Sequence, residues 1–239
     1  MERAMEGEQR PEQGTEGHGH ASLRPTFEEQ LQSVKDDVLR LGAMVESQLH
    51  RAGSALIERD VELADQVRWG DAEVNELQRV IDLAITVIIA RQAPMARDIR
   101  ELLALYHASA ELERMGDYAV NIAKLAQQLA SEPEMPILRQ IPQMEELCRQ
   151  QLRDAMRALV DVSEEQAREV CARDDEIDDL YNSVYEDTMA LMGVAPDKVR
   201  QATHMLFAAH HLERLADRVT NIGEDVVFLV TGQIEDLNT

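Results

Sequence analysis

The sequence predicts an all-α protein made of two tandem three-helix bundles that arose from an internal duplication. Aromatic residues make up only 3% of the chain, whereas hydrophobic residues make up 44%. Leu, Ala, Val and Met must therefore fill the core, and with many Glu and Arg they favour helices over strands. Prolines are absent between Thr26 and Ala93 and between Gln143 and Ala195, which leaves long stretches compatible with helix. The third observation is that the two halves share motifs in the same order.

Helix breakers divide the chain into its elements. Pro94, the proline-rich segment 132–142, and Gly193 with Pro196 are the main breakers after residue 25. Between them we expect six long helices, at 27–57, 60–90, 96–130, 141–161, 164–192 and 196–231. The first bundle is expected to span 26–131 and the second 137–239. Residues 1–25 are rich in Glu, Gly, Gln, His and Pro, and we expect a disordered tail there.

The duplication is visible in two matched segments. Leu112-Glu-Arg-Met-Gly-Asp-Tyr-Ala-Val-Asn-Ile122 matches Leu212-Glu-Arg-Leu-Ala-Asp-Arg-Val-Thr-Asn-Ile222 at six of eleven positions, with an offset of 100 residues. Upstream, Asp71-Ala-Glu-Val-Asn-Glu-Leu77 matches Asp174-Asp-Glu-Ile-Asp-Asp-Leu180 with an offset of 103 residues. Two matches in the same order at nearly the same offset indicate a repeated unit of about 100 residues.

Charge and composition exclude several classes of partner. Lys and Arg number 24 against 46 Asp and Glu, which gives a formal net charge of −22. Such a chain does not suit nucleic acid or an anionic membrane surface. The longest apolar runs are too short to span a bilayer, and the first residues lack the apolar core of a signal peptide. With only Cys148 and Cys171 and no disulfide framework, we expect a reducing, cytoplasmic compartment.

Paired acidic residues recur in both units. The pairs are Asp71 with Asn75, Glu113 with Asp117, Asp174 with Asp178, and Glu213 with Asp217. Each pair has i, i+4 spacing, which places both side chains on one helix face about 40° apart. On the third helix the pair borders the apolar stripe, so these carboxylates are expected to be partly buried and to need a partner. If the second and third helices of a unit pack together, the two pairs form a four-residue pocket.

Carboxylate and amide oxygens are ligands for hard cations, so each pocket is a candidate metal site. The alternative is that Arg114 and Arg214, or Arg97 and Arg100, neutralise the acids structurally. Catalysis has no support, because the sequence contains no GxGxxG, GxxxxGK[ST], GxSxG or HExxH motif. A ferritin-like oxidase is also disfavoured, because no ExxH occurs. Cys148 and Cys171 are expected to be small core residues.

At these motifs the chain resembles the PhoU family of phosphate-signalling regulators. The resemblance covers roughly residues 26–235. It is carried by Arg91-Gln-Ala-Pro-Met-Ala-Arg-Asp-Ile-Arg100, by the segment 112–124, and by His211-Leu-Glu-Arg-Leu-Ala-Asp-Arg-Val-Thr-Asn-Ile-Gly-Glu224. Two departures stand out. Asn75 occupies a position where the family usually has a carboxylate, and Lys198 stands where the first unit has Asp98.

The resemblance implies a cytoplasmic, non-enzymatic regulator. Such proteins act with the ATPase subunit of a phosphate ABC transporter and with a sensor histidine kinase, and restrain phosphate uptake and the starvation response. The resemblance also implies multinuclear metal clusters of Fe, Zn, Mn or Mg on the paired acidic motifs, held here by Asp71, Glu113, Asp117, Asp174, Asp178, Glu213 and Asp217. A homodimer is expected as well.

Two other functions stay open at this point. One is a metal-dependent enzyme, a hydrolase or oxidase, on the carboxylate clusters, which would need an open coordination position and a general base. The other is a structural helical dimer without metal, in which arginines pair with all the carboxylates.

Overall fold

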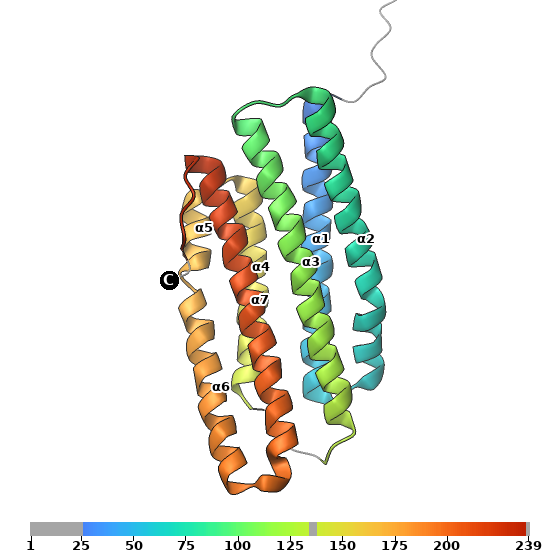
Figure 1. Cartoon of the computed structure of the whole chain (residues 1–239), viewed down its shortest axis with the longest axis vertical. Coiled ribbons are helices and arrows are strands. Elements are labelled where there is room, and N and C mark those ends of the chain that lie inside the picture. The colour runs from blue at the N-terminus through green and yellow to red at the C-terminus, as the bar shows by residue number, and fades with distance from the viewer. Residues whose placement is uncertain (1–25, 134–137, 238–239) are drawn as a thin grey trace, which may run out of the picture.

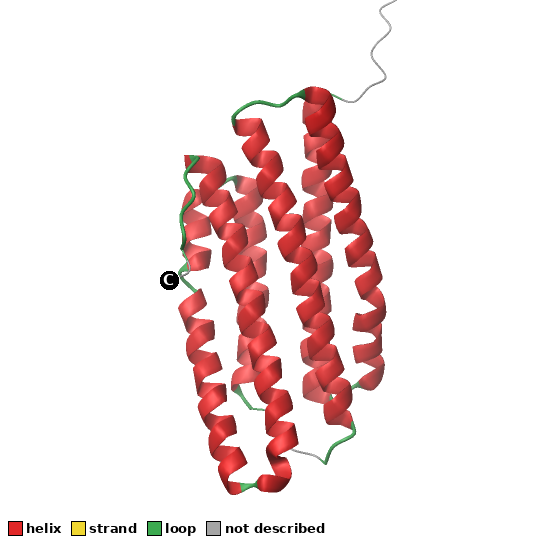
Figure 2. Cartoon of the chain, viewed as in Figure 1, coloured by secondary structure: helices red, strands yellow, loops and turns green. Residues whose placement is uncertain are grey.

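A computed structural model describes residues 26–133 and 138–237, and within these ranges it contains helices and no strand (Figure 2). The predicted disordered tail at 1–25 lies outside the described residues. The elements are α1 (Phe27–Glu58), α2 (Val61–Gln92), α3 (Arg97–Ala130), α4 (Gln140–Asp161), α5 (Glu164–Cys171), α6 (Asp174–Val194), the short 3₁₀ helix η1 (Pro196–Lys198) and α7 (Val199–Thr231). The all-α prediction is therefore confirmed.

Local signals explain where several helices begin. The Thr26 hydroxyl accepts a hydrogen bond from the Glu29 amide, and the Glu29 carboxylate accepts one from the Thr26 amide, so a capping box starts α1. Asp60 caps α2 through the Leu63 amide, and Ser163 caps α5 through the Gln166 amide. These caps satisfy amide groups that a helix leaves without partners at its first turn.

The single helix predicted at 164–192 is wrong, because the chain breaks at Ala172 and Arg173 into α5 and α6. The Arg173 amide bonds to the Val170 carbonyl, so the end of α5 tightens into a turn. A new helix then begins at Asp174, whose first turn is acidic. Negative side chains are stabilising at a helix N-terminus, where backbone amide groups lack partners. The break therefore sets the position of Asp174 at the start of α6.

The helices form two bundles that pack side by side (Figure 1). Helices α1, α2 and α3 pack on one another, and α7 packs against α4, α5 and α6. The bundles meet where α3 lies along α7 and where α1 contacts α4. The buried side chains form one continuous core, mostly of Leu, Ile, Val, Ala and Met. The boundaries 26–131 and 137–239 stay predictions.

The packing between bundles follows an approximate twofold symmetry. A Cβ on Gly42 of α1 would lie 3.1 Å from the Met156 side chain of α4, and a Cβ on Gly53 would lie 2.7 Å from the Glu145 side chain. At the repeat offset of 103 residues, Glu145 corresponds to Gly42 and Met156 to Gly53. Gly42 thus makes room for the counterpart of Gly53, and Gly53 makes room for the counterpart of Gly42. Such reciprocal contacts arise where two related helices pack antiparallel.

The proline-rich joint is bonded to both bundles where the structure describes it. Arg59, which ends α1, donates hydrogen bonds to the carbonyl oxygens of Glu132 and Pro133, each at 3.1 Å. Gln201 of α7 donates to the same Pro133 oxygen at 2.7 Å. Within the described residues, no helix is long and apolar enough to cross a membrane.

The contact of α5 with Gly223 of α7 gives a prediction about stability. A Cβ on Gly223 would lie 2.6 Å from Cys171 Sγ and 3.3 Å from the Ala167 carbonyl oxygen, so in Gly223→Ala either the Cys171 side chain or the helices must shift. We expect it to lower the free energy of unfolding by about 1–3 kcal/mol.

The matched control is Gly193→Ala in α6, where nothing lies within 4 Å of the added atom. We expect it to raise stability by up to about 1 kcal/mol through helix propensity. Urea unfolding followed by circular dichroism measures both variants. Equal effects of the two substitutions would contradict the close packing at Gly223.

Candidate metal centres

The structure brings the four predicted residues of the first unit together between α2 and α3. Asp71 and Asn75 lie one turn apart on α2, and the Asn75 amide donates to Asp71 Oδ2 at 2.9 Å. Glu113 and Asp117 lie one turn apart on α3 and are close enough to Asp71 for their charges to interact. These residues form the first cluster.

Burial and mutual repulsion make the first cluster costly to ionise. Burial is the main reason that the pKa of Asp71 is raised, and the Asp117 charge adds to it. Burial likewise raises the pKa of Glu113, followed by the charges of Asp117 and Asp71. Lys124 opposes the shift at Asp71. A cation between these side chains would relieve the same repulsion.

The second cluster contains the corresponding residues of the second unit. Asp174 and Asp178 come from α6, and Glu213 and Asp217 come from α7. Burial, then the charges of Asp217 and Asp178, raise the pKa of Asp174 to about 6, against a smaller lowering by Gln151. All four carboxylates interact through their charges, so the structure brings this set together as well.

Glu213 is the most perturbed carboxylate of this cluster. Burial and the Asp217 charge raise its pKa to about 7, with smaller contributions from Asp178 and Asp174. His210 Nδ1 lies 3.4 Å from Glu213 Oε2, one turn back on the same helix. At neutral pH Glu213 is therefore poised between its protonated and ionised forms.

Arginines neutralise the clusters only in part. Arg214 Nη1 lies 2.6 Å from Asp217 Oδ2 and also bonds to Tyr118 of α3, so this carboxylate has a structural counter-ion. Arg114, at the same position of the first motif, instead pairs with Glu111 at 3.1 Å. The Arg100 guanidinium lies beside Gly232, at the end of α7.

Several buried oxygen atoms in the clusters have no hydrogen-bond partner among the described residues. These atoms are Asp71 Oδ1, Asn75 Oδ1, Asp174 Oδ1, Asp174 Oδ2 and Glu213 Oε2. Buried polar atoms in native proteins nearly always have a partner, so each of these requires an explanation. Unpartnered carboxylate and amide oxygens are the donor set that a hard cation takes. The type of these donor atoms therefore suits a bound metal ion.

The side chains do not converge on a single point. Across the described part of the chain, no three His, Cys, Asp or Glu side chains are placed together as ligands. A metal would require rotations of these side chains on their helices. The role of the eight residues as metal ligands stays a prediction.

Two residues near the clusters were not predicted from the sequence. Gln48 of α1 and Gln151 of α4 are buried, and the Oε1 atom of each has no hydrogen-bond partner among the described residues. A signal for them exists, because Gln48-Leu-His-Arg-Ala52 and Gln151-Leu-Arg-Asp-Ala155 share Gln, Leu and Ala at the offset of 103 residues. This match extends the repeat to the first helix of each unit.

Other reactive side chains have structural surroundings. Cys148 and Cys171 are free and buried, as expected, and burial raises the pKa of both thiols, that of Cys171 to about 12. Thiols held protonated in this way are poor nucleophiles and poor metal ligands. His107 of α3 lies 3.1 Å from Asp225 of α7 and joins the two bundles.

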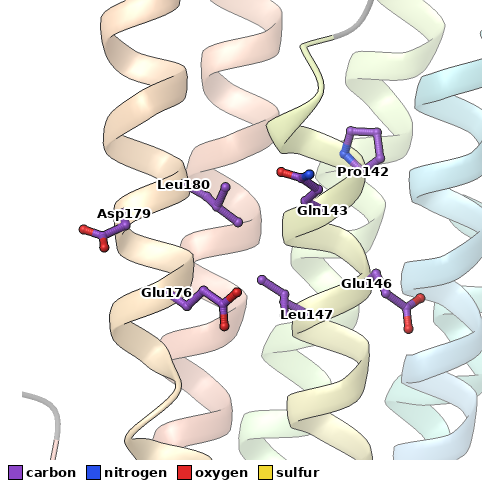
Figure 3. Close-up of a pocket in the computed structure, with 7 residues that line it drawn as sticks. All are labelled: Pro142, Gln143, Glu146, Leu147, Glu176, Asp179 and Leu180. Atoms are coloured by element: carbon purple, nitrogen blue, oxygen red, sulfur yellow. The ribbon is translucent and has the colours of Figure 1, made fainter.

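A groove of about 600 Å³ lies between α4 and α6 (Figure 3). Leu147 and Leu180 line it, with Glu176 and Asp179 on the α6 side. It is lined by Pro142, Gln143, Glu146, Leu147, Glu176, Asp179 and Leu180, none of which is a predicted site residue. The groove therefore shares no lining residue with the acidic clusters.

Comparison with known proteins matches both units. A family model described as the PhoU domain matches residues 38–126 and 141–226. A phosphate-specific transport system accessory protein PhoU homolog of Clostridium acetobutylicum is 34% identical over 216 residues, covering 90% of this chain and 99% of that protein. Its counterpart in Caulobacter vibrioides is 35% identical over 209 residues, covering 87% of this chain and 91% of that protein.

Two solved structures share the fold. The crystal structure of PhoU from Pseudomonas aeruginosa has a TM-score of 0.84 at 31% identity, covering 87% of this chain and 100% of that one. The phosphate transport system regulatory protein PhoU from Streptococcus pneumoniae has a TM-score of 0.83 at 29% identity, covering 88% and 100%. The likeness thus extends over both bundles.

Proposed function

Because this chain belongs to the PhoU family, whose curated members are named as accessory proteins of phosphate transport, we propose that it restrains phosphate uptake and the phosphate-starvation response. In this proposal it acts on the ATPase subunit of a phosphate ABC transporter and on a sensor histidine kinase. It does so as a binding protein, without catalysis. The homodimer and the cytoplasmic location stay predictions.

We further propose that each acidic cluster binds metal ions. The unpartnered buried oxygens of Asp71, Asp174 and Glu213 support this most directly. Oxygen donors suit Mg²⁺ and Mn²⁺, and clustered carboxylates also accommodate iron or zinc. Ionised carboxylates are what a cation binds, so metal occupancy would offset the repulsion that raises these pKa values.

Metal binding offers a route to regulation. The paired motifs of α3 and α7 lie on the two helices that join the bundles, and Tyr118, next to Asp117, bonds to Arg214, next to Glu213. A change at one cluster would therefore reach the other through this contact. At a net charge of −22, phosphate itself would need a bridging cation to bind near the clusters.

Complementation in a bacterium that lacks its own PhoU tests the regulatory role. We expect the wild-type chain to restore repression of a phosphate-starvation reporter when phosphate is plentiful. We expect the variant with Ala at Glu113, Asp117, Glu213 and Asp217 to fail at an equal protein level, because it cannot bind metal.

The outcomes separate the parts of the proposal. Failure of the wild-type chain to repress the reporter would contradict the regulatory role. Full repression by the variant would leave regulation standing and contradict the link to metal. Turnover of a phosphoester with Mn²⁺ by the wild type, lost in the variant, would contradict the absence of catalysis.

A further inference from the structure

Gln48 is a buried polar residue on α1 that faces the first cluster. Its side chain is 7% exposed. It lies between two glycines of the neighbouring helices, with Nε2 3.5 Å from the point that a Cβ on Gly70 would occupy, and Oε1 3.3 Å from the same point on Gly116. The absence of side chains at these two positions makes the room in which the amide group sits.

The Gln48 amide oxygen belongs with the unpartnered oxygens of the cluster. Asp71 Oδ1 lies 3.7 Å from the same point on Gly116, so both atoms border one small space. Neither atom has a hydrogen-bond partner in the described part of the chain, and Asn75 Oδ1, one turn along α2, has none either. A single cation would satisfy all three acceptor oxygens at once, since acceptors do not satisfy one another.

Gln151 holds the same position in the second unit. It is 1% exposed and lies beside Asp174, the counterpart of Asp71. Its Nε2 donates to the Val170 carbonyl oxygen at 3.2 Å, while its Oε1 has no partner among the described residues. The Gln151 side chain is close enough to Asp174 to lower the pKa of that carboxyl, but neither Asp174 oxygen has a hydrogen bond of normal geometry among the described residues. The duplication has therefore kept a buried amide at both clusters.

We propose that Gln48 and Gln151 are cation ligands that contribute an amide oxygen from the first helix of each unit. The inference rests on the proposed metal binding and extends it: each cluster becomes a site shared by three helices of its bundle. A cation held in this way joins α1 to α2 and α3, and α4 to α6 and α7. A neutral amide oxygen is a ligand for Mg²⁺ and Mn²⁺, so these are the ions that we expect the amide to favour.

The competing explanation is that each glutamine only donates a hydrogen bond to a neighbouring carboxylate. Substitution of each glutamine distinguishes a cation ligand from a hydrogen-bond donor. Met has nearly the same shape without the oxygen, so it removes a ligand. Glu keeps an oxygen and adds a charge, which strengthens cation binding but repels Asp71 or Asp174 if the amide serves as a donor.

Titration with Mn²⁺ alone, by calorimetry on the full chain, tests the proposal. We expect Gln48→Met with Gln151→Met to weaken Mn²⁺ binding by about tenfold or more, as loss of a supporting ligand does. We expect Gln48→Glu with Gln151→Glu to bind Mn²⁺ at least as tightly as the wild type. The matched control is Gln201→Met, a buried glutamine of α7 whose Nε2 bonds to Pro133, and it should leave binding unchanged.

The outcomes distinguish this inference from the function on which it rests. Wild-type affinity in the Met variant would overturn the ligand role while metal binding stands. No Mn²⁺ binding by the wild type would overturn both. If the Met variant does not fold, the Glu variant decides: binding weaker than wild type overturns the ligand role, and binding that is retained or tighter supports it.

Discussion

Raising the pH from about 5 to about 8 will destabilise the metal-free protein, and saturating Mn²⁺ will cancel that loss. The folded-state pKa of Glu213 is about 7 against an ordinary 4.5, and that of Asp174 is about 6 against 3.8. At pH values between the ordinary and the raised pKa, the folded state binds more protons than the unfolded state. Stability therefore falls as the pH rises through this range, and the loss is complete by about pH 8.

The expected size is a few kcal/mol. One pKa unit corresponds to about 1.4 kcal/mol. Asp174 is buried, whereas Glu213 is only partly buried, so solvent screens part of the contribution of Glu213. A cation binds the ionised carboxylates, so Mn²⁺ should stabilise the folded state most at high pH. Urea unfolding across this pH range, with and without Mn²⁺, measures both effects.

The control is Asp174→Asn with Glu213→Gln, which removes the two titrating groups without changing their shape. We expect it to flatten the pH dependence and to abolish the Mn²⁺ response of the second cluster. Some slope should remain, because burial also raises the pKa of Asp225 to about 6. A free energy of unfolding of the metal-free protein that rises with pH would contradict the account. An unchanged pH dependence of that free energy in the variant would contradict it as well.

Glu213→Ala with Asp217→Ala will lower Mn²⁺ binding more than Glu113→Ala with Asp117→Ala. The second cluster has four carboxylates, whereas the first has three carboxylates and the neutral amide of Asn75. A neutral ligand attracts a divalent ion less than a carboxylate does. The Arg214 pair with Asp217 offsets part of this difference, so the ratio between the two affinities is expected to be about tenfold.

One pair of substitutions isolates the cause of that difference. Asn75→Asp should strengthen binding at the first cluster, and Asp178→Asn, at the corresponding position, should weaken binding at the second. Calorimetric titration with Mn²⁺ reports each affinity. Equal losses from the two Ala pairs, together with no gain from Asn75→Asp, would contradict the role assigned to Asn75.

Much of the fold was predictable because it follows from local rules. The duplicated motif and the positions of proline and glycine defined the helices, and most helix bounds agree within about three residues. The gathering of Asp71 with Asp117, and of Asp174 with Asp217, was also predictable, since i, i+4 pairs on adjacent helices can meet.

What the sequence left open depends on packing between helices. Arg114 and Arg214 occupy the same motif position, yet Arg114 pairs with Glu111 and Arg214 with Asp217. Arg214 also bonds to Tyr118 of the other bundle. No proline or glycine marks the break at Ala172, so the positions of helix breakers could not reveal it. Gln48 carries no charge, so its place beside the cluster becomes visible only once α1 is packed on α2 and α3.

The metal content of the purified protein tests the central claim most directly. Tag-free protein prepared without chelator is compared, by mass spectrometry, with the variant carrying Ala at Glu113, Asp117, Glu213 and Asp217, after circular dichroism shows that both are folded. The account predicts stoichiometric iron, zinc, manganese or magnesium in the wild type and its loss in the variant. No metal in either protein, or equal metal in both, would contradict it and leave the acidic clusters a structural or partner-binding role.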